Sequence, residues 1–281
     1  MTNGPNENDK TRFRELAEQA ASLVPAKLVQ LPLWPDEKRG APNAILRSAV
    51  FSGGKPITSV RVRHEHKLLP VLPPFAVYYT GPQLYQPDLD VCLELWHRCR
   101  LSPLGDVSTF HARSLLRALG RHTGKANYED LRSSIRALIG AEIEVKHRDA
   151  EGRTRGYVGH LVESLAYDDG TQQWRVRVNP EIAKLFAPSE HTWLPVSARL
   201  ALGKGYLAKW VHGYFSTHRS PLPISVEHLR GLSGSSAGRL RKFREGLKAA
   251  LEDVAAVERA DGRVFAWRID ENDMVHVTRG R

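Results

Sequence analysis

The residues from Leu232 to Val254 read LSGSSAGRLRKFREGLKAALEDV, and the fold is predicted from this segment. Apolar residues recur in it with the spacing of one helix face: Leu240, Phe243, Leu247, Ala250, Leu251 and Val254. Basic residues lie mostly off that face, and from Arg230 to Lys248 there are six of them against one acid. Ser235 or Ser236 is expected to cap the first turn. Small residues at a helix start let its backbone approach phosphates closely, and the amides there favour anions.

The segments on either side complete a recognisable order. Val226–Leu232 is predicted to form a short helix, and Gly234 breaks the chain after it. Short β-like runs follow the basic helix: 255–257, 264–269 and 275–277. A helix, a turn, a basic helix and a hairpin are the order of a winged helix-turn-helix. A basic helix alone indicates a solvated surface over an ordinary core; the turn before it and the hairpin after it favour a helix that reads DNA.

Length and charge set the class of partner. The chain has 281 residues, so it can hold two cores. Its net charge of +10 favours a polyanionic partner.

Cys92 and Cys99 lie seven residues apart in one helical pattern, which is too far for a disulfide. They are expected to be buried thiols in a reducing cytoplasm. We expect neither a membrane span nor a secretion leader, because no run of about 20 apolar residues occurs.

The first half of the chain repeats the order of the second. Helices are predicted at 88–100 and 111–119, with a short extended piece at 109–110 between them. The next segment, 120–138, reads GRHTGKANYEDLRSSIRAL; Asn127 with Asp130 forms a capping pattern, and Arg132 and Arg136 face outward. Strands at 141–146, 156–167 and 173–178 are predicted to form a β wing that carries Arg153 and Arg155. The chain is therefore predicted to contain two copies of one architecture.

Three regions follow from this division: residues 1–43 as a flexible N-terminal arm, 44–188 as the first domain and 189–281 as the second. The fold class is α+β, with two tandem winged helix-turn-helix domains. The arm carries the proline-studded apolar string Gln30-Leu31-Pro32-Leu33-Trp34. From composition alone, this string is either a short linear motif for a partner or an arm that packs its Leu and Trp on the first domain.

The sequence does not indicate catalysis. Gly120–Ala126 is not a phosphate loop, because only three residues separate its glycines and Ala126 stands where a magnesium-binding Ser or Thr belongs. The twelve histidines are scattered without metal spacing, and no nucleophile elbow or carboxylate couple is evident. We therefore expect no enzyme activity, no cofactor and no metal.

Several strings resemble the TrfA-type replication initiators of IncP-like broad-host-range plasmids. They are LPLWP at 31–35, DLDV at 88–91, PLGD at 103–106, ALGRHTGK at 118–125, NPEIAKL at 179–185, WVHG at 210–213, LSGS at 232–235 and LKAAL at 247–251. The stretch 52–74 departs from the family pattern. The resemblance implies two winged-helix domains that bind repeated duplex sites (iterons) at a plasmid origin and help to open an A·T-rich region, with single-stranded origin DNA as a further partner. It also implies recruitment of the host DnaA protein and replicative helicase, an active monomer and an inactive dimer that limits copy number.

The resemblance also assigns residues. Gln30, Leu31, Leu33 and Trp34 are similar to the Gln-Leu-x-Leu-Phe peptide by which bacterial proteins dock on the polymerase sliding clamp, and this similarity favours the linear-motif interpretation. The residues expected to bind DNA in the second domain are Ser235, Ser236, Arg239, Arg241, Lys242, Arg244 and Lys248, with Arg259 and Arg263 on its wing. Those of the first domain are His122, Thr123, Lys125, Asn127, Arg132 and Arg136, with Arg153 and Arg155 on its wing.

Three other functions stay open at this point. A winged-helix transcription regulator would bind a palindromic operator as a stable dimer. An enzyme acting on nucleic acid would need metal ligands or a Tyr-plus-His cluster, neither of which is evident. A protein-binding adaptor would depend mainly on the clamp-like peptide.

Overall fold

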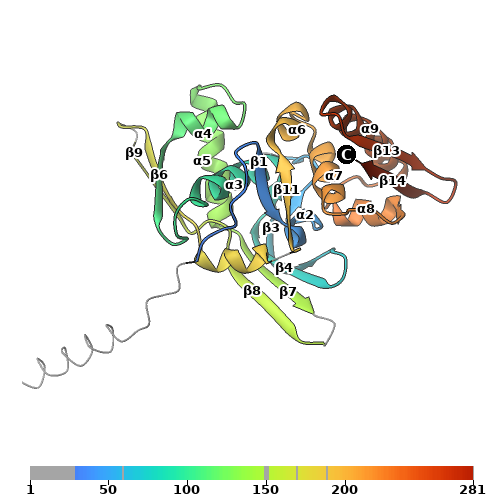
Figure 1. Cartoon of the computed structure of the whole chain (residues 1–281), viewed down its shortest axis with the longest axis horizontal. Helices are drawn as coiled ribbons and strands as arrows, with labels where there is room; N and C mark the ends of the chain where they lie inside the picture. Colours follow the sequence, from blue (N-terminus) through green and yellow to red (C-terminus); the bar gives the residue numbers. More distant parts are fainter. Residues whose placement is uncertain (1–28, 59, 149–151, 169, 188, 281) are drawn as a thin grey trace, which may run out of the picture.

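The computed structural model describes residues 29–58, 60–148, 152–168, 170–187 and 189–280. Its buried apolar side chains form two clusters, one drawn from residues 31–194 and the other from 202–277. Figure 1 shows the first unit at the left and centre and the second unit at the right. The predicted α+β class is confirmed. Residues 1–28 of the predicted arm lie outside the described part of the chain.

The first unit contains most of the strands. In chain order its elements are β1 (Lys38–Pro42), α2 (Asn43–Leu46), β2 (Phe51–Ser52), β3 (Arg63–Leu69), β4 (Phe75–Pro82), β5 (Leu84–Tyr85), α3 (Gln86–Cys99), β6 (Val107–His111), α4 (Ala112–Ala118), α5 (Lys125–Ile139), β7 (Glu142–Arg148), β8 (Thr154–His160), β9 (Ser164–Asp168), β10 (Gln173–Arg177), the 3-10 helix η1 (Pro180–Phe186) and β11 (His191–Pro195). Helix α3 begins with a capping box, in which Asp88 Oδ2 accepts from the Tyr85 amide at 2.8 Å. Cys92 and Cys99 are buried free thiols on α3, as expected.

The strands after α5 belong to two different sheets. Strands β7 and β8 form a hairpin that extends β3 and β4 in a four-stranded sheet of order β3-β4-β7-β8. Strands β9 and β10 form a second hairpin, and β10 pairs with β6 in the sheet β6-β10-β9. The prediction of one wing from all of these strands is therefore wrong. The hairpin that accompanies α4 and α5 is β9–β10, because its strand β10 pairs with β6, the strand before α4.

The second unit has the simpler order that its sequence predicts. Its elements are α6 (Val196–Ala201), α7 (Tyr206–Ser216), β12 (Ile224–Ser225), α8 (Val226–Leu232), α9 (Leu240–Ala260), β13 (Val264–Ile269) and β14 (Met274–Gly280). The sheet order is β12-β14-β13, with Ile269 opposite Val275. The predicted short helix at 226–232 is confirmed. The predicted β-like run at 255–257 is wrong, because α9 continues through it with Val254 and Ala255 buried.

The chain before residue 44 is not a separate arm in its described part. Strand β1 pairs antiparallel with β11, so that Lys38 lies opposite Pro195 and Pro42 opposite His191. Residues 29–43 thus belong to the first unit. The same pairing places 191–195 in the first unit, although these residues were predicted to belong to the second domain. The two cores meet between Leu194 and Leu202.

Candidate nucleic-acid interface

Helix α9 is held by one apolar stripe and exposes its cations on the other side. Phe243, Leu247, Leu251 and Val254 are buried against the second core, as their spacing predicts. The residues that line the opposite side are exposed and basic: Arg239, Arg241, Lys242 and Lys248. This arrangement produces a cationic rod whose apolar side anchors it to the protein.

The cations of α9 differ in whether they are already paired. Among the described residues, Arg239, Lys242 and Lys248 have no ion-pair partner. Arg241 lies 3.2 Å from Glu245 one turn later, where both side chains are exposed. Arg244 Nε donates to Asp273 Oδ1 at 2.6 Å, which ties the helix to the turn between β13 and β14. Arg244 therefore positions the hairpin against α9.

The connection before α9 is a turn in which Ser233 is buried and Ser236 exposed. Ser225 caps α8 by accepting from the His228 amide at 3.1 Å. The predicted serine cap on α9 is wrong: α9 begins at Leu240, Arg239 occupies the N-cap, and its side chain makes no capping bond. Ser235 Oγ instead accepts from the Ala237 amide at 3.3 Å inside the turn.

The end of α9 is fixed to the hairpin by a buried carboxylate. Glu258 accepts from His212 Nε2 at 3.0 Å and also from Arg263 Nε. Burial raises the pKa of Glu258, but His212 and Arg263 outweigh it and hold the pKa at about 2.

Arg263 also bonds Asp261 at 2.8 Å, whereas Arg259 is exposed. Of the two expected wing cations, Arg263 is engaged in structural contacts. Arg268 on β13 is also exposed, and it was not among the residues expected to bind DNA, although strand alternation predicts its exposure.

In the first unit, α5 starts at Lys125 with Gly124 at its N-cap. The predicted Asn127 cap is wrong: its side-chain amide donates to the carbonyl of His122 at 2.8 Å. His122, Thr123 and Lys125 are exposed around this start, and Arg136 is exposed further along the helix. Arg132 lies over aromatic rings instead, 4.4 Å from the Tyr167 centroid and 5.8 Å from that of Trp174. The sequence did not indicate this pairing, because both rings come from the β9–β10 hairpin.

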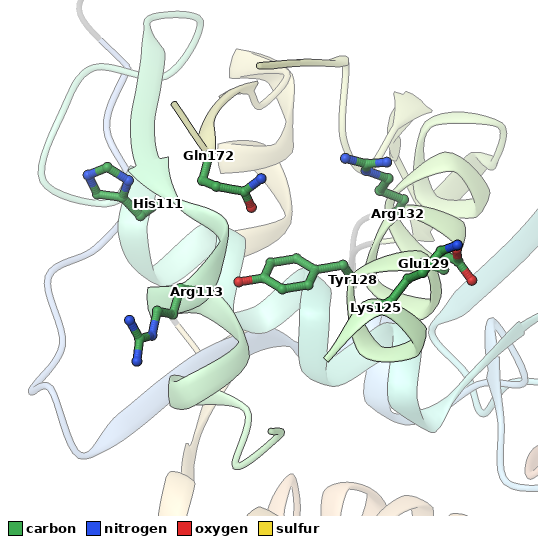
Figure 2. A pocket seen from close by; sticks show the side chains of 7 residues that line it. All are labelled: His111, Arg113, Lys125, Tyr128, Glu129, Arg132 and Gln172. Carbon is green, nitrogen blue, oxygen red and sulfur yellow. The ribbon is translucent and has the colours of Figure 1, made fainter. Parts of the chain in front are cut away.

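A groove of about 770 Å³ opens beside α5. It is lined by His111, Arg113, Lys125, Tyr128, Glu129, Arg132 and Gln172. Figure 2 shows the Tyr128 ring reaching across it toward His111 and Arg113, with Lys125 and Arg132 on the α5 side. His111, Arg113 and Tyr128 were not among the residues expected to contact DNA; only the fold brings them beside Lys125.

Arg153 and Arg155 lie away from this groove. Arg155 is on β8 opposite His147, and Arg153 directly precedes β8. Figure 1 shows the β7–β8 hairpin pointing away from α4 and α5. The structure therefore does not bring these two arginines together with the cations of α5.

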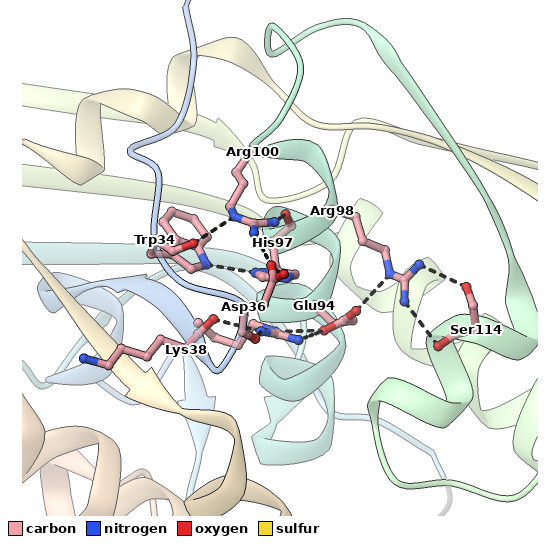
Figure 3. Close-up of polar contacts among 9 residues, drawn as sticks. Trp34, Asp36, Lys38, Glu94, His97, Arg98, Arg100 and Ser114 are labelled. Atoms are coloured by element: carbon pink, nitrogen blue, oxygen red, sulfur yellow. Dashed lines mark hydrogen bonds and ion pairs between the residues drawn. The ribbon is translucent and has the colours of Figure 1, made fainter.

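The clamp-like peptide is docked on the first unit. Trp34 is 3% exposed, and its Nε1 donates to His97 Nδ1 at 3.0 Å (Figure 3). Its ring stacks on Phe186 at a centroid distance of 5.9 Å, and Arg100 Nε donates to its carbonyl at 3.2 Å. Gln30 also bonds the Arg100 carbonyl, at 2.9 Å. Of the two interpretations of this string, the arm that packs its Leu and Trp on the first unit describes this conformation.

Leu31 is buried as well, whereas Leu33 is 64% exposed. In this conformation two of the four residues expected to bind the clamp, Leu31 and Trp34, are buried in the protein. Clamp binding stays a hypothesis, and it requires the peptide to leave its site.

Within the described ranges, no group of three or more His, Cys, Asp or Glu side chains is placed to hold a metal ion. In the same ranges, no helix has both the length and the apolarity needed to cross a membrane.

The TrfA protein family model matches residues 7–279. The chain belongs to the TrfA protein family. It is a plasmid replication initiator, as the sequence resemblance implied. The plasmid replication initiator protein TrfA of Escherichia coli is 28% identical over 296 residues, which cover 96% of this chain and 73% of that protein.

More distant likenesses agree with this assignment. RepFIB replication protein A of Escherichia coli and that of Salmonella typhi are each 26% identical over 163 residues, which cover 55% of this chain and 49% of each relative. The chain thus spans about half of the RepFIB proteins. The crystal structure of domains 2 and 3 of RctB superposes with a TM-score of 0.52 at 10% identity, covering 84% of this chain and 96% of that one. At that identity the likeness concerns the fold alone.

Proposed function

We propose that this initiator binds repeated duplex sites at its plasmid's origin through two winged-helix domains. The element order supports the assignment: α3-β6-α4-α5 with the β9–β10 hairpin in the first unit, and α7-β12-α8-α9 with the β13–β14 hairpin in the second. In both units the strand before the helix pair joins the sheet of the hairpin, which fixes the hairpin beside the second helix. The likeness to RctB domains 2 and 3 supports the same fold.

The observation that carries the proposal is the set of unpaired cations on α9. Arg239, Lys242 and Lys248 are exposed and have no ion-pair partner among the described residues, so they are available to phosphates and guanine edges. Arg239 stands at the N-cap, and the N-terminal residues of a recognition helix contact base edges. In the proposal, Ser235, Ser236 and Arg241 complete this surface and Arg259 contacts the backbone.

The first unit adds a second contact along the duplex. His122, Thr123, Lys125 and Arg136 are exposed on or just before α5, next to the groove that Arg113 and Tyr128 line. A DNA backbone that passes this groove would meet several cations, which supports a phosphate-binding role for this face of the first unit. In the proposal, Arg132 supports this surface by packing over the Tyr167 ring. Asn127 supports it by bonding the His122 carbonyl in the turn before α5.

The proposal also includes opening of an A·T-rich region of the origin and contact with the host DnaA protein and replicative helicase. It further includes sliding-clamp binding by the Gln30–Trp34 peptide once this peptide leaves its site on the first unit. It assigns no catalytic activity, and a magnesium-dependent nicking assay on origin DNA tests that assignment.

Arg239→Ala tests the proposal. Affinity for a duplex carrying one origin repeat should fall by about 1–3 kcal/mol, with relaxed specificity at one base pair, if Arg239 reads a base. Equal losses on a random duplex would mean that it contacts phosphate only. Lys184→Ala, on η1, removes one positive charge from an exposed lysine that pairs with Glu181, and it is the control for the loss of charge alone. Wild-type affinity of Arg239→Ala on both duplexes would contradict the proposal.

Binding as a monomer is a further part of the proposal. Footprinting on the plasmid's own origin, with stoichiometry, should give one protein per repeat. A stable dimer on a palindrome would favour a transcription regulator instead.

A further inference from the structure

The turn between α8 and α9 is braced by a loop from the other unit. The amide of Gly53 donates to the Ser233 carbonyl at 2.8 Å, and Ser52 Oγ donates to the Gly234 carbonyl at 2.9 Å. Ser52 Oγ also accepts from the Gly54 amide at 3.0 Å, which holds the loop in a tight bend. The loop that follows β2 is therefore part of the surface around the start of α9.

The loop after β2 lies close to the second unit at two consecutive residues, Gly53 and Gly54. A Cβ at Gly53 would lie 2.9 Å from Trp210 Cβ, and a Cβ at Gly54 would lie 3.4 Å from the Ser236 amide nitrogen. A side chain at position 53 would force the loop or Trp210 to move, so Gly53 permits the close contact with the second unit. The loop is thus fixed beside Ser236, three residues before Arg239.

Lys55 is the next residue along this fixed backbone. It is exposed, and among the described residues it has no ion-pair partner. Consecutive Cα atoms are about 3.8 Å apart, so Lys55 is one residue from Gly54, where a Cβ would lie 3.4 Å from the Ser236 amide nitrogen. Its long stem carries a strongly hydrated point charge, the kind of group that contacts phosphate without reading sequence.

We propose that Lys55 of the first unit is a phosphate contact of the second DNA-reading unit. The surface around α9 is then composite: Arg239 and Lys242 come from the helix, and Lys55 comes from the neighbouring unit. This inference rests on the proposed function, because it assumes that α9 lies on duplex DNA. The docked loop keeps Lys55 in place before binding, so less ordering is needed when the complex forms.

The test compares Lys55→Ala, Lys55→Arg and the control Lys184→Ala in the 281-residue chain. Each is titrated with a labelled duplex carrying one origin repeat and with a random duplex of equal length, at several salt concentrations. Lys55→Ala should lose about three- to tenfold in affinity on both duplexes, and the slope of log K against log salt should become shallower by about 1. Lys55→Arg should retain binding, and Lys184→Ala should match the wild type.

A direct readout uses cysteine chemistry. Cys92 and Cys99 are buried, so a cysteine placed at position 55 by Lys55→Cys can be labelled selectively with an azide photo-crosslinker. It should crosslink to the origin duplex, whereas the same label on Lys184→Cys should not.

These measurements distinguish a failure of the Lys55 contact from a failure of the proposed function. Unchanged affinity and salt slope for Lys55→Ala, with binding lost in Arg239→Ala, would overturn the role of Lys55 and leave the proposed function standing. A loss on the origin duplex alone would also overturn it, because a phosphate contact weakens both duplexes. Wild-type binding by both variants would contradict the proposed function itself.

Discussion

Arg199 Nε of α6 donates to Asp90 Oδ1 of α3 at 2.6 Å, across the boundary between the two units. Lys209 Nζ of α7 donates to the other carboxylate oxygen, also at 2.6 Å. Burial by itself raises the pKa of Asp90, but the two cations outweigh it and lower the pKa below its ordinary value. The carboxylate therefore stays ionised at neutral pH and joins both units.

Asp90→Ala should destabilise the protein by about 3–5 kcal/mol, because it leaves two buried cations without their partner. Chemical denaturation at neutral pH measures this effect. Glu181→Ala, which removes an exposed partner of Lys184, is the control and should cost less than about 1 kcal/mol. An equally small loss in Asp90→Ala would show that the ion pairs do not hold the units together.

Arg244→Ala should reduce DNA affinity less than Arg239→Ala, because Arg244 is already bonded to Asp273 and Arg239 has no ion-pair partner among the described residues. The Arg244–Asp273 pair is partly exposed, so a double-mutant cycle on stability should give a coupling of about 0.5–1 kcal/mol. Titration with the origin duplex compares the two arginines. A larger loss for Arg244→Ala would mean that Arg244 exchanges Asp273 for DNA on binding.

Gly40→Ala should loosen the docked peptide. A Cβ at position 40 would lie 2.8 Å from the Trp34 ring, so the ring has to move. If the peptide binds the sliding clamp in its released form, clamp affinity should rise several-fold in surface-plasmon measurements. Gly238→Ala, where a Cβ meets nothing within 4 Å, is the control. No rise in Gly40→Ala, when its near-UV spectrum reports a displaced tryptophan, would argue against the clamp hypothesis.

Stability should fall in mild acid because of His97. Burial, with Arg39 and Arg100 nearby, lowers its pKa from 6.5 to about 4. Below pH 6.5 the unfolded chain therefore binds a proton that the folded protein does not, and stability is lost as pH falls from 6.5 to about 4. Protonation would also remove the Nδ1 acceptor of the Trp34 bond.

His97→Asn keeps an acceptor and cannot titrate. Its melting temperature should decline less between pH 7 and pH 4.5 than that of the wild type. The pKa values of His212 and His218 are also lowered by burial, so the variant keeps part of the decline. Identical pH profiles would show that His97 does not contribute to it.

Local sequence patterns predicted the helices whose apolar residues recur with helical spacing. The stripe Phe243, Leu247 and Leu251 gave α9, and the family strings gave a correct family assignment. The predicted caps failed at both α5 and α9: Asn127 does not cap α5, and neither Ser235 nor Ser236 caps α9. A cap depends on where a helix starts, and that is decided by the turn packed before it.

What the sequence determined by itself was the periodicity of the helices, the excess of cations on α9 and the family, because each of these is written in neighbouring residues. Only the tertiary structure decided which hairpin accompanies α5, that Trp34 is buried against His97, and that Ser52 braces the turn before α9. Those features join segments far apart in the chain, and their free energy comes from surfaces that exist only after both partners have folded.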